Sequence, residues 1–543
     1  MANRPRIIVG LDYGTTYTGV AYIDVIGNNH GRSHNDIQLI QNWGGHGTDE
    51  KVPSQIAYGK DGVVTWGNLI PQRATGRKFW TKLQLDERNK SSERSEEFRR
   101  LISFLQRMGI ADGLGDDDGG EDGPPEYPGK EPVDIVADYL TFIRERLMEA
   151  LSSRFGVALN TIPMELVVTV PAVWSDKAKD LTFKAVTKAG FKTDQMKISM
   201  VAEPEAAALW TMRSMAESAL VSAIKVNDNF VICDAGGGTV DLISYRIRAI
   251  KPDLEVEECA VGTGDKCGAT FVDQEFISWL KEKLGDQYFN KIPADQREIG
   301  SKLMKEFNTA KMAFRNENDD YYVSLPRAVG IDDDLGRGIQ DGEIIITSSD
   351  MREIFDPSIN RALELIDGQI AEVMNRNNVV KNVILVGGFG RSDYMYQRVQ
   401  EYCQERGLGA LRPMFPWSAV VRGAVIYGMN PDNKGMVKKR MCRMHYGTPI
   451  SELFDPTKHE PDQGFIDDDT GLKFARDEQA ICVLHADLTD IPESKFTKAT
   501  RGTGGGVFFV ASFKIEITIR GNLLDFALLF DGERKGSVEA KYT

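Results

Sequence analysis

Cysteine and histidine are scarce in this chain. Its 543 residues include six cysteines and six histidines, with no Cys-x-x-Cys pair and no histidine cluster at zinc spacing. These absences exclude a zinc module or a disulfide framework as the basis of the fold. Scattered cysteines are typical of a reduced compartment, so we expect a cytoplasmic protein, although the sequence does not distinguish the cytosol from the nucleus.

Long apolar runs and an excess of positive charge are missing as well. No run approaches the roughly 18 to 20 residues that cross a bilayer, and the apolar residues after the basic N-terminus are too few for a secretory signal. The 66 lysines and arginines are outnumbered by 80 aspartates and glutamates, which gives a formal net charge of -14. Such a charge repels nucleic acid and acidic membranes, so we expect no nucleic-acid or membrane partner.

The chain is long enough for three or more folding units, and its element pattern is α/β. Apolar residues recur at helical spacing from Val136 to Leu151, which predicts a helix that ends near Gly156. A β-branched run over 166–174 predicts a strand buried on both faces, and Ser175 can cap the helix that follows. A strand that leads into a capped helix is a unit of an α/β fold.

Two segments depart from this pattern. Gly, Pro, Asp and Glu crowd residues 111–132, which predicts a solvated surface loop, with an acidic peptide-docking segment as the alternative. After about residue 430, apolar and polar residues alternate over 513–520 before an apolar run over 523–530, which predicts a hairpin. We therefore expect residues 431–543 to form a small β-rich domain.

Two glycine turns carry the most information. The segments LDYGTT at 11–16 and CDAGGGT at 233–239 both follow an apolar run of strand character. Glycine removes the Cβ atoms, so backbone N–H groups can approach a phosphate oxygen, with a hydroxyl beside them and a carboxylate at the strand end. A pair of such turns predicts a nucleotide that is gripped from two sides.

With further segments in the same order, the chain resembles the actin-like ATPase superfamily, and within it the nucleotide-binding domain of the seventy-kilodalton heat-shock chaperones. The segments that carry the resemblance are GLDYGTTY at 10–17, TVPA at 169–172, AEPEAAA at 202–208, DAGGGTVD at 234–241, Gly264-Asp265 with Gly268, and VGGFGR at 386–391. They lie between about residues 7 and 430, and they are specific as a set.

The resemblance implies an α/β, two-lobed actin-like ATPase fold built on duplicated ribonuclease H-like mixed sheets. The first lobe would take up about residues 1–220 and the second about residues 221–430. It also implies that ATP or ADP binds with Mg²⁺ between the lobes, and that slow hydrolysis is coupled to a conformational switch. Protein clients or co-chaperones are the further partners that it implies.

At the phosphate end, the resemblance agrees with the chemistry of the residues. Asp12 and Asp234 can hold a largely hydrated Mg²⁺ through its water molecules. Glu203 is similar to the family's acid that orients the attacking water, although the start of a helix also favours an acid. Lys82 is the candidate cation near the γ-phosphate, with Lys78 and Arg77 as alternatives. The residues expected to cradle the phosphates are Gly14, Thr15, Thr16, Tyr17, Gly236, Gly237, Gly238 and Thr239.

The adenosine end departs from the family pattern. The residues that the resemblance assigns to it are Asn308, Lys311, Met312, Arg315, Gly387, Gly388, Phe389 and Arg391. Among these, Asn308 and Met312 replace an acid and a cation of the family, and Phe389 replaces a small hydroxyl residue. Trp417 lies where an acid would face the base. We expect a nucleotide affinity weaker than that of typical chaperones, or a base held by aromatic stacking.

The altered base contacts, together with a tail too short for both a peptide-binding β-sandwich and a helical lid, resemble the atypical twelfth branch of the heat-shock family, of fungal type. Two alternatives to an ATP-driven switch stay open. One is a sugar or polyol kinase of the same superfamily, for which no segment supplies a clear carboxylate base. The other is a nucleotide-binding scaffold that hardly hydrolyses ATP.

Overall fold

A computed structural model gives two compact units, Met1–Met441 and Cys442–Thr543. The residues that it describes in the first unit are 5–25, 34–45, 48–59, 62–71, 74, 77–86, 130–194, 196–216, 225–250, 255–297, 300–429 and 437–441. In the second unit they are 452–457, 464–466, 473–475, 482–486, 497–500, 507–510, 514–520, 523–530, 533–535 and 538–542. The predicted acidic loop lies outside these residues up to residue 129.

The first unit contains two large mixed sheets. In one of them the strand order is β3-β2-β1-β8-β9, and β4 also pairs with β2. Strand β1 is antiparallel to β2 and parallel to β8, and β8 is parallel to β9. The bounds of these strands are β1 Arg6–Tyr13, β2 Tyr17–Val25, β3 Gln38–Leu39, β4 Val52–Pro53, β8 Met164–Val170 and β9 Met196–Ala202.

The second sheet repeats this plan. Its order is β17-β16-β10-β11-β12-β18, where β10 is antiparallel to β11 and parallel to β16. Its strands are β10 Asn229–Ala235, β11 Val240–Ala249, β12 Glu255–Asp265, β16 Val380–Val386, β17 Gly409–Leu411 and β18 Val437–Lys439. In both sheets a three-stranded antiparallel meander continues into two parallel strands, so the duplicated mixed sheets predicted from the resemblance are confirmed. We call the part of the unit built on each sheet the first and the second lobe.

Equivalent helices accompany the two sheets. In the first lobe α2 (Pro132–Phe155) precedes β8, and α3 (Asp176–Lys188) joins β8 to β9; in the second lobe α9 (Ser348–Asn375) precedes β16, and α10 (Asp393–Glu405) joins β16 to β17. The predicted end of α2 is confirmed, because Gly156 is its C-cap. The Ser175 side chain caps α3 by accepting a hydrogen bond from the Ala178 N–H, also as predicted.

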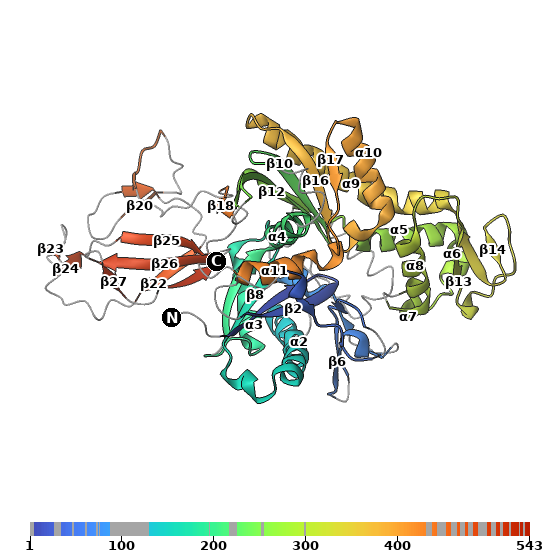
Figure 1. Cartoon of the computed structure of the whole chain (residues 1–543), viewed down its shortest axis with the longest axis horizontal. Coiled ribbons are helices and arrows are strands. Elements are labelled where there is room, and N and C mark those ends of the chain that lie inside the picture. The colour runs from blue at the N-terminus through green and yellow to red at the C-terminus, as the bar shows by residue number, and fades with distance from the viewer. Residues whose placement is uncertain are drawn as a thin grey trace. The chain divides into compact units, whose positions relative to one another are not determined.

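Two helices cross between the lobes. Helix α4 (Glu203–Ala216) follows the first sheet but packs on β10 and β11, whereas α11 (Ala419–Met429) follows the second sheet but packs on β1, β2 and β8. Figure 1 shows both helices at the centre of the first unit. A Cβ atom at Gly423 would lie only 1.7 Å from the Ala206 carbonyl oxygen, so the two helix backbones touch at this point. The apolar core between the sheets therefore includes residues from both lobes.

Smaller elements complete the first unit. A three-stranded sheet in the first lobe consists of β5 Ile56–Tyr58, β6 Val64–Trp66 and β7 Arg77–Lys78. The second lobe carries α5 Ala269–Leu284, α6 Asp286–Phe289, α7 Ala294–Arg297, α8 Lys302–Ala313, β13 Tyr321–Ser324, β14 Ile339–Gln340 and β15 Glu343–Ile346. Short 3₁₀ helices are η1 His34–Asp36, η2 Gly67–Leu69, η3 Thr81–Leu85, η5 Gly156–Thr161, η7 Arg327–Val329, η8 Phe389–Arg391 and η9 Pro416–Ser418. Rings of Phe276 and Phe307 stack at 3.8 Å and join α5 to α8.

The end of the first unit lies beyond the boundary near residue 430 that the sequence indicates. Strand β18 pairs with the edge strand β12, and the following Arg440 forms an ion pair with the buried Glu205 of α4 at 2.7 Å. Glu258 of β12 accepts a hydrogen bond from the Met441 N–H at 2.7 Å. These contacts hold the residues up to Met441 on the first unit.

The described elements of the second unit are all strands, in agreement with the predicted β-rich tail. The predicted hairpin is confirmed, because β25 pairs antiparallel with β26. The strands are β19 Glu452–Leu453, β20 Gly464–Ile466, β21 Lys473–Ala475, β22 Cys482–Ala486, β23 Thr497–Thr500, β24 Val507–Val510, β25 Lys514–Arg520, β26 Leu523–Phe530, β27 Glu533–Lys535 and β28 Val538–Tyr542. In this hairpin Lys514 and Glu516 are exposed, whereas Ala527 and Phe530 are buried.

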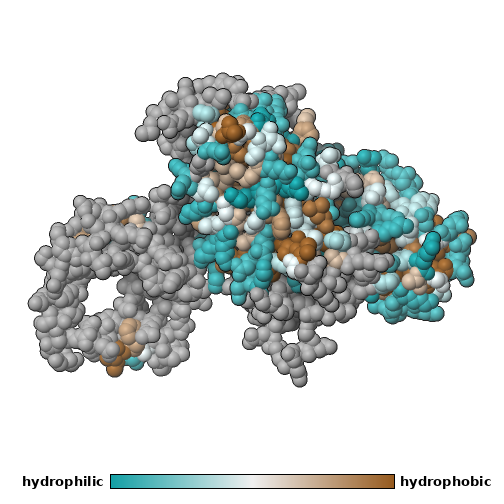
Figure 2. Space-filling view, turned by 90° about the horizontal axis from the view of Figure 1, so that it is seen from below, coloured by the Kyte–Doolittle hydropathy of each residue, from teal (hydrophilic) through white to brown (hydrophobic). Residues whose placement is uncertain are grey.

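The described surface is mainly hydrophilic on the face shown in Figure 2, where small hydrophobic areas interrupt it. This agrees with the 27% content of charged residues. Among the described residues, no helix combines the length and the apolar character that a membrane span needs.

Candidate functional site

The two glycine turns close in the same way. In the β1–β2 turn the Gly14 N–H donates to the Tyr17 carbonyl at 3.1 Å, and in the β10–β11 turn the Gly236 N–H donates to the Thr239 carbonyl at 2.9 Å. A Cβ atom at Gly14 would lie 2.3 Å from the Tyr17 carbonyl oxygen, so a side chain does not fit there. The turns are therefore equivalent in backbone geometry as well as in sequence.

The two turns also meet in space. A Cβ atom on Gly237 would lie 2.0 Å from Thr16 Oγ1, and one on Gly238 would lie 2.9 Å from Thr15 Cγ2. Two glycines of the second lobe thus make room for two threonines of the first. Hydroxyl groups and backbone N–H groups from both lobes converge here, which is an arrangement that suits phosphate oxygens.

A cleft of about 830 Å³ adjoins these turns. Every candidate residue assigned from the sequence lines it, from Asp12 and Asp234 at one end to Arg315 and Arg391 at the other. Of the two alternatives to Lys82, Arg77 lines the cleft, whereas Lys78 is not among its lining residues. The two carboxylates on which the nucleotide hypothesis depends therefore share one cleft.

Asp12 is buried and both of its carboxylate oxygens have partners. The Lys51 ammonium donates to Oδ2 at 2.6 Å, and the Thr169 hydroxyl donates to Oδ1 at 3.1 Å. The side chains of Lys51 and Asp12 are only 8% and 6% exposed. Burial of a charge without a partner costs free energy, so each of these two charged side chains stabilises the other in its buried position.

Asp234 is equally buried but has no such partner. Within the described part of the chain, its carboxylate accepts no hydrogen bond and forms no ion pair, and Gly387 lies against it. A Cβ atom at Gly387 would sit 2.4 Å from Asp234 Oδ1, and the backbone there has a φ of +90°, so glycine is needed on both grounds. Burial raises the pKa of Asp234 well above its usual value, and the nearby Glu203, Asp241 and Asp12 carboxylates raise it further. The Lys51 ammonium partly opposes this shift, although it forms no ion pair with Asp234.

Lys82 and Glu203 form a second buried ion pair. Lys82 lies in η3 of the first lobe, and its Nζ is 2.5 Å from Oε1 of Glu203, the first residue of α4. The Trp174 ring covers the ammonium, with its centroid 5.5 Å from Nζ. Burial raises the pKa of Glu203 to about 7, and the Lys82 ammonium opposes this shift. Burial therefore disfavours the ionised form of Glu203, while the Lys82 ammonium favours it.

The end of the cleft that is predicted to bind adenosine contains several ion pairs. Lys311 of α8 reaches Asp273 of α5 at 2.5 Å, and burial raises the pKa of that aspartate. Arg315 and Arg412 both bind Asp393 at the start of α10, at 3.0 and 2.9 Å. The predicted base-binding cations Lys311 and Arg315 thus have carboxylate partners from neighbouring elements.

Aromatic side chains line the same end. The ring of Trp417 meets the edge of Tyr17 from the first turn, with centroids 5.6 Å apart, and Arg391 lies 5.8 Å from the Trp417 centroid. Gly388 leaves room for the indole, because a Cβ atom there would be 3.3 Å from it. Phe389 is only 3% exposed and belongs to the core of the second lobe. Trp417 is therefore better placed than Phe389 to contact a base.

Neither an acid nor a cation stands at the two altered helix positions. Met312 is 56% exposed, and the Asn308 amide donates to its sulfur at 3.7 Å. Both side chains line the cleft. Asn308 and Met312, which depart from the family pattern, therefore form part of the cleft wall.

The family model described as Hsp70 protein matches residues 131–435, which is more than half of the chain. The chain belongs to the Hsp70 family. Its relatives include Heat shock 70 kDa protein 12A of Mus musculus, which is 22% identical over 546 residues covering 86% of this chain and 75% of the relative. Heat shock 70 kDa protein 12B of Homo sapiens is 22% identical over 558 residues, covering 88% and 77%.

The similarity to typical Hsp70 chaperones covers less of the chain. The Chaperone protein DnaK of Thermoplasma volcanium is 24% identical over 293 residues, which cover 53% of this chain and 42% of the relative. The greater coverage of the 12A and 12B proteins confirms the prediction of the atypical twelfth branch of the Hsp70 family. The fungal-type assignment stays a prediction.

Sequence reasoning missed three charged residues of this Hsp70-family site. Lys51 pairs with Asp12, Asp273 pairs with Lys311, and Asp241 accepts a hydrogen bond from the Thr239 hydroxyl at 2.8 Å. Asp241 could have been predicted from the sequence, because it ends the DAGGGTVD segment. The other two have no local signal, since their partners are 39 and 38 residues away.

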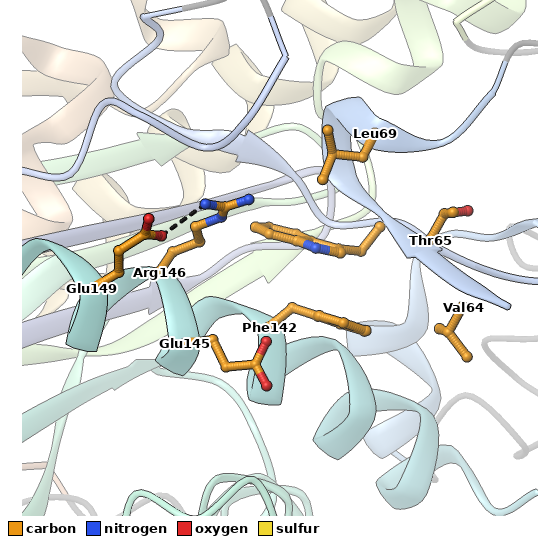
Figure 3. A pocket seen from close by; sticks show the side chains of 8 residues that line it. Val64, Thr65, Leu69, Phe142, Glu145, Arg146 and Glu149 are labelled. Atoms are coloured by element: carbon orange, nitrogen blue, oxygen red, sulfur yellow. Dashed lines mark hydrogen bonds and ion pairs between the residues drawn. The ribbon is translucent and has the colours of Figure 1, made fainter.

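A second, smaller pocket lies on the first lobe. It has a volume of about 420 Å³ and lies between β6–η2 and α2, where Arg146 and Glu149 form an ion pair (Figure 3). The Trp66 and Phe142 rings stack at 5.7 Å on its wall. None of the residues assigned to the nucleotide lines this pocket. Among the described residues, no cluster of three or more His, Cys, Asp or Glu side chains could hold a metal ion.

Proposed function

We propose that this protein is an ATP-binding, slowly ATP-hydrolysing, chaperone-like switch whose two lobes hold the nucleotide between them. Membership of the Hsp70 family supports an ATP-binding chaperone in general. The observation that carries the proposal is the meeting of two equivalent glycine turns, one from each lobe, beside the buried Asp12 and Asp234. Phosphoryl transfer depends mainly on the positioning of the phosphates and on stabilisation of their charge. The N–H and hydroxyl groups of two such turns can provide both for a polyphosphate chain.

Each group at the phosphate end has a role in this proposal. The N–H groups and hydroxyls of the two turns bind the β- and γ-phosphate oxygens. Glu203 orients the attacking water and accepts its proton, and Lys82 fixes the Glu203 carboxylate and adds positive charge beside the γ-phosphate. A bound Mg²⁺ would neutralise phosphate charge, and the buried Asp234 carboxylate without a partner fits a cation held through water.

At the adenosine end, the base stacks on Trp417 in the place of the family's polar contacts. Lys311 and Arg315 are engaged by carboxylates, so they shape the wall of the cleft more than they bind the base. We expect a nucleotide affinity lower than that of typical Hsp70 chaperones, because stacking replaces hydrogen bonds.

Calorimetry with ATP and ADP, with and without Mg²⁺, tests binding, and single-turnover hydrolysis tests catalysis. We expect saturable binding and slow hydrolysis in the native chain, and loss of Mg²⁺-dependent hydrolysis in Asp234→Ala. Absence of binding to the native chain contradicts the proposal. A phosphorylated product formed from a sugar or polyol, with a many-fold rise in ATP consumption, supports the kinase instead.

A nucleotide-binding scaffold with little hydrolysis is the second candidate. The observation that favours it is the engagement of Glu203 by Lys82, since an acid tied to a cation is a weaker base. Single-turnover hydrolysis separates the two, because a scaffold binds ATP and returns it unchanged. Protein clients, co-chaperones and a cytoplasmic location remain part of the proposal and follow only from the family and from the scattered cysteines.

A further inference from the structure

Lys51 reaches Asp12 along a row of residues that crosses three strands. Asp12 of β1 pairs with Gly19 of β2, and on the other side of β2 Thr18 pairs with Val52 of β4. By this register Lys51 comes next to Gly19. A Cβ atom at Gly19 would lie 3.1 Å from Lys51 Cγ and 3.3 Å from its Cε, so the lysine stem passes directly over the glycine. The missing side chain lets the ammonium cover two strand spacings of roughly 4.8 Å each.

The same row in the second lobe has different chemistry. There Asp234 of β10 pairs with Asp241 of β11, and Asp241 pairs with Gly264 of β12. The order is aspartate, glycine and lysine in the first lobe, but aspartate, aspartate and glycine in the second. The first row therefore pairs a carboxylate with an ammonium group, whereas the second row consists of two aspartates and a glycine. The Lys51 ammonium is also close enough to Asp234 to lower the pKa of that carboxyl group.

We propose that Lys51 is a built-in cation of the phosphate site, which binds the phosphate chain beside Asp12 and leaves only the Asp234 side for a divalent ion. This inference rests on the proposed function and changes one part of it. Asp12, whose two oxygens are engaged by Lys51 and Thr169, holds the lysine and is not a ligand of the ion or of its water. Asp234 then provides the carboxylate that interacts with the ion.

A fixed ammonium replaces part of what the divalent ion supplies. A hydrogen bond from a charged donor to a phosphate oxygen changes affinity by about 10- to 100-fold. Without a divalent ion, the native site should therefore still bind ADP. Removal of the lysine frees Asp12 for the ion, so binding should become more dependent on Mg²⁺.

The experiment is to measure the Kd of ADP by calorimetry in Mg²⁺ and in EDTA, for the native chain and for Lys51→Met. We expect the variant to lose about 10- to 100-fold in affinity in EDTA and clearly less in saturating Mg²⁺, so that the ratio of the two Kd values rises about tenfold or more. Lys51→Arg keeps the positive charge and should keep a ratio within about threefold of the native one. An unchanged ratio in Lys51→Met overturns the proposal.

Adenosine is the probe that separates a phosphate role from a structural one. Lys51→Met should bind adenosine as the native chain does, and an equal loss for adenosine and ADP overturns the proposal. Since Lys51→Met leaves a buried carboxylate without its partner, the double variant Asp12→Asn/Lys51→Met serves as the folding control. This double variant should lose as much ADP affinity in EDTA as Lys51→Met does, but Mg²⁺ should not raise its ADP affinity more than it does in the native chain. If Mg²⁺ raises the affinity as much as in Lys51→Met, the idea that Asp12 becomes available to the ion is contradicted.

A readout without nucleotide completes the test. The melting temperature of the ligand-free chain is measured with MgCl2 and with a monovalent salt at matched ionic strength. We expect Mg²⁺ to stabilise Lys51→Met more than the native chain, because two carboxylates then face the ion, and equal shifts count against the proposal. If the native chain binds neither ADP nor ATP, the proposed function fails; if it binds both but the ratio does not move, only the role of Lys51 fails.

Discussion

The two lobes share a strand plan and a glycine turn, but they differ in the charged groups that they bring to the phosphate end of the cleft. The first lobe pairs two carboxylates at this end with ammonium groups, Asp12 with Lys51 and Glu203 with Lys82 of η3. The second lobe supplies Asp234 and Asp241, which pair with each other across β10 and β11, and within the described residues the Asp234 carboxylate forms no ion pair. A duplicated backbone thus provides the same strand arrangement twice, and a few cross-strand substitutions give the two copies different charges.

The sharpest test of this asymmetry is to neutralise the equivalent aspartates one at a time. Asp234→Asn should lower Mg²⁺-dependent single-turnover hydrolysis by about 100- to 1,000-fold, because it removes the carboxylate that would hold Mg²⁺ beside the reacting phosphate. Asp12→Asn should lower it less, because its main partner is Lys51. Equal losses would show that the two lobes are functionally symmetric.

The Lys82–Glu203 pair gives the next largest effect. Lys82→Met should reduce hydrolysis by roughly 100-fold while the Kd of ATP changes little, since the ammonium acts on charge in the transition state. Equal loss of binding and turnover would assign Lys82 to substrate binding alone. Isothermal calorimetry and single-turnover kinetics on the same preparations give both quantities.

The pH dependence of hydrolysis checks the same pair. The pKa of Glu203 is raised to about 7, so the ionised base is lost as the pH falls through 7 and the rate should fall with it. Because Lys82 lowers this pKa, Lys82→Met should move the midpoint to higher pH, and Glu203→Gln should remove the transition. A midpoint that stays in place in Lys82→Met would contradict a coupling between the two side chains.

The same carboxyl group should affect folding stability. Its folded pKa is above the ordinary value of 4.5, so between about pH 4.5 and 7 the native state binds more protons than the unfolded state. The free energy of unfolding of the nucleotide-free chain should therefore fall as the pH rises through this window, by on the order of 3 kcal/mol from Glu203. Urea unfolding at pH 5 and pH 8 should show this loss in the native chain and a smaller one in Glu203→Gln.

The contact between the lobes can be tested with two glycines in helices. Gly423→Ala places a Cβ atom 1.7 Å from the Ala206 carbonyl oxygen and should destabilise the first unit by about 2 to 3 kcal/mol. Gly368→Ala in α9 meets nothing within 4 Å and should stabilise it by roughly 0.5 to 1 kcal/mol. Thermal unfolding of the two variants should therefore shift in opposite directions.

The smallest effect is expected at the adenosine end. Trp417→Ala should weaken ATP and adenosine alike, by up to about tenfold, because it removes a stacking surface and no charge. Tyr17→Ala, which removes the edge-on partner of that indole, should weaken both less. Loss of ATP affinity with unchanged adenosine affinity in Trp417→Ala would rule out the stacking role.

Sequence alone gave the fold and the candidate residues of the cleft because their signals are local. The glycine turns, the strand predicted over 166–174 and the capped helix after Ser175 depend on neighbours in the chain, although the strand itself, β8, covers Met164–Val170 and ends before Pro171. The resemblance then supplied the order of the elements. All the residues that it assigned line one cleft, although their roles stay predictions.

What sequence could not give depends on contacts between distant residues. Lys51 is an ordinary lysine beside a short strand until the register of β4, β2 and β1 brings it over Gly19 to Asp12. Likewise, the partners of Arg315 and Arg412 become clear only when α10 packs beside the end of α8. The crossing of α4 and α11 is hidden as well, since each helix packs on the lobe that does not precede it.

That crossing has a mechanical consequence. Each helix follows a strand of one lobe and packs on the other lobe. The lobes therefore cannot slide apart without disrupting the apolar core around Ala206 and Gly423. We expect them to rotate about this backbone contact, which acts as a fulcrum. A rotation there would change the distance between the Thr15–Thr16 and Gly237–Gly238 tips, so a phosphate held by both tips would restrict the angle between the lobes.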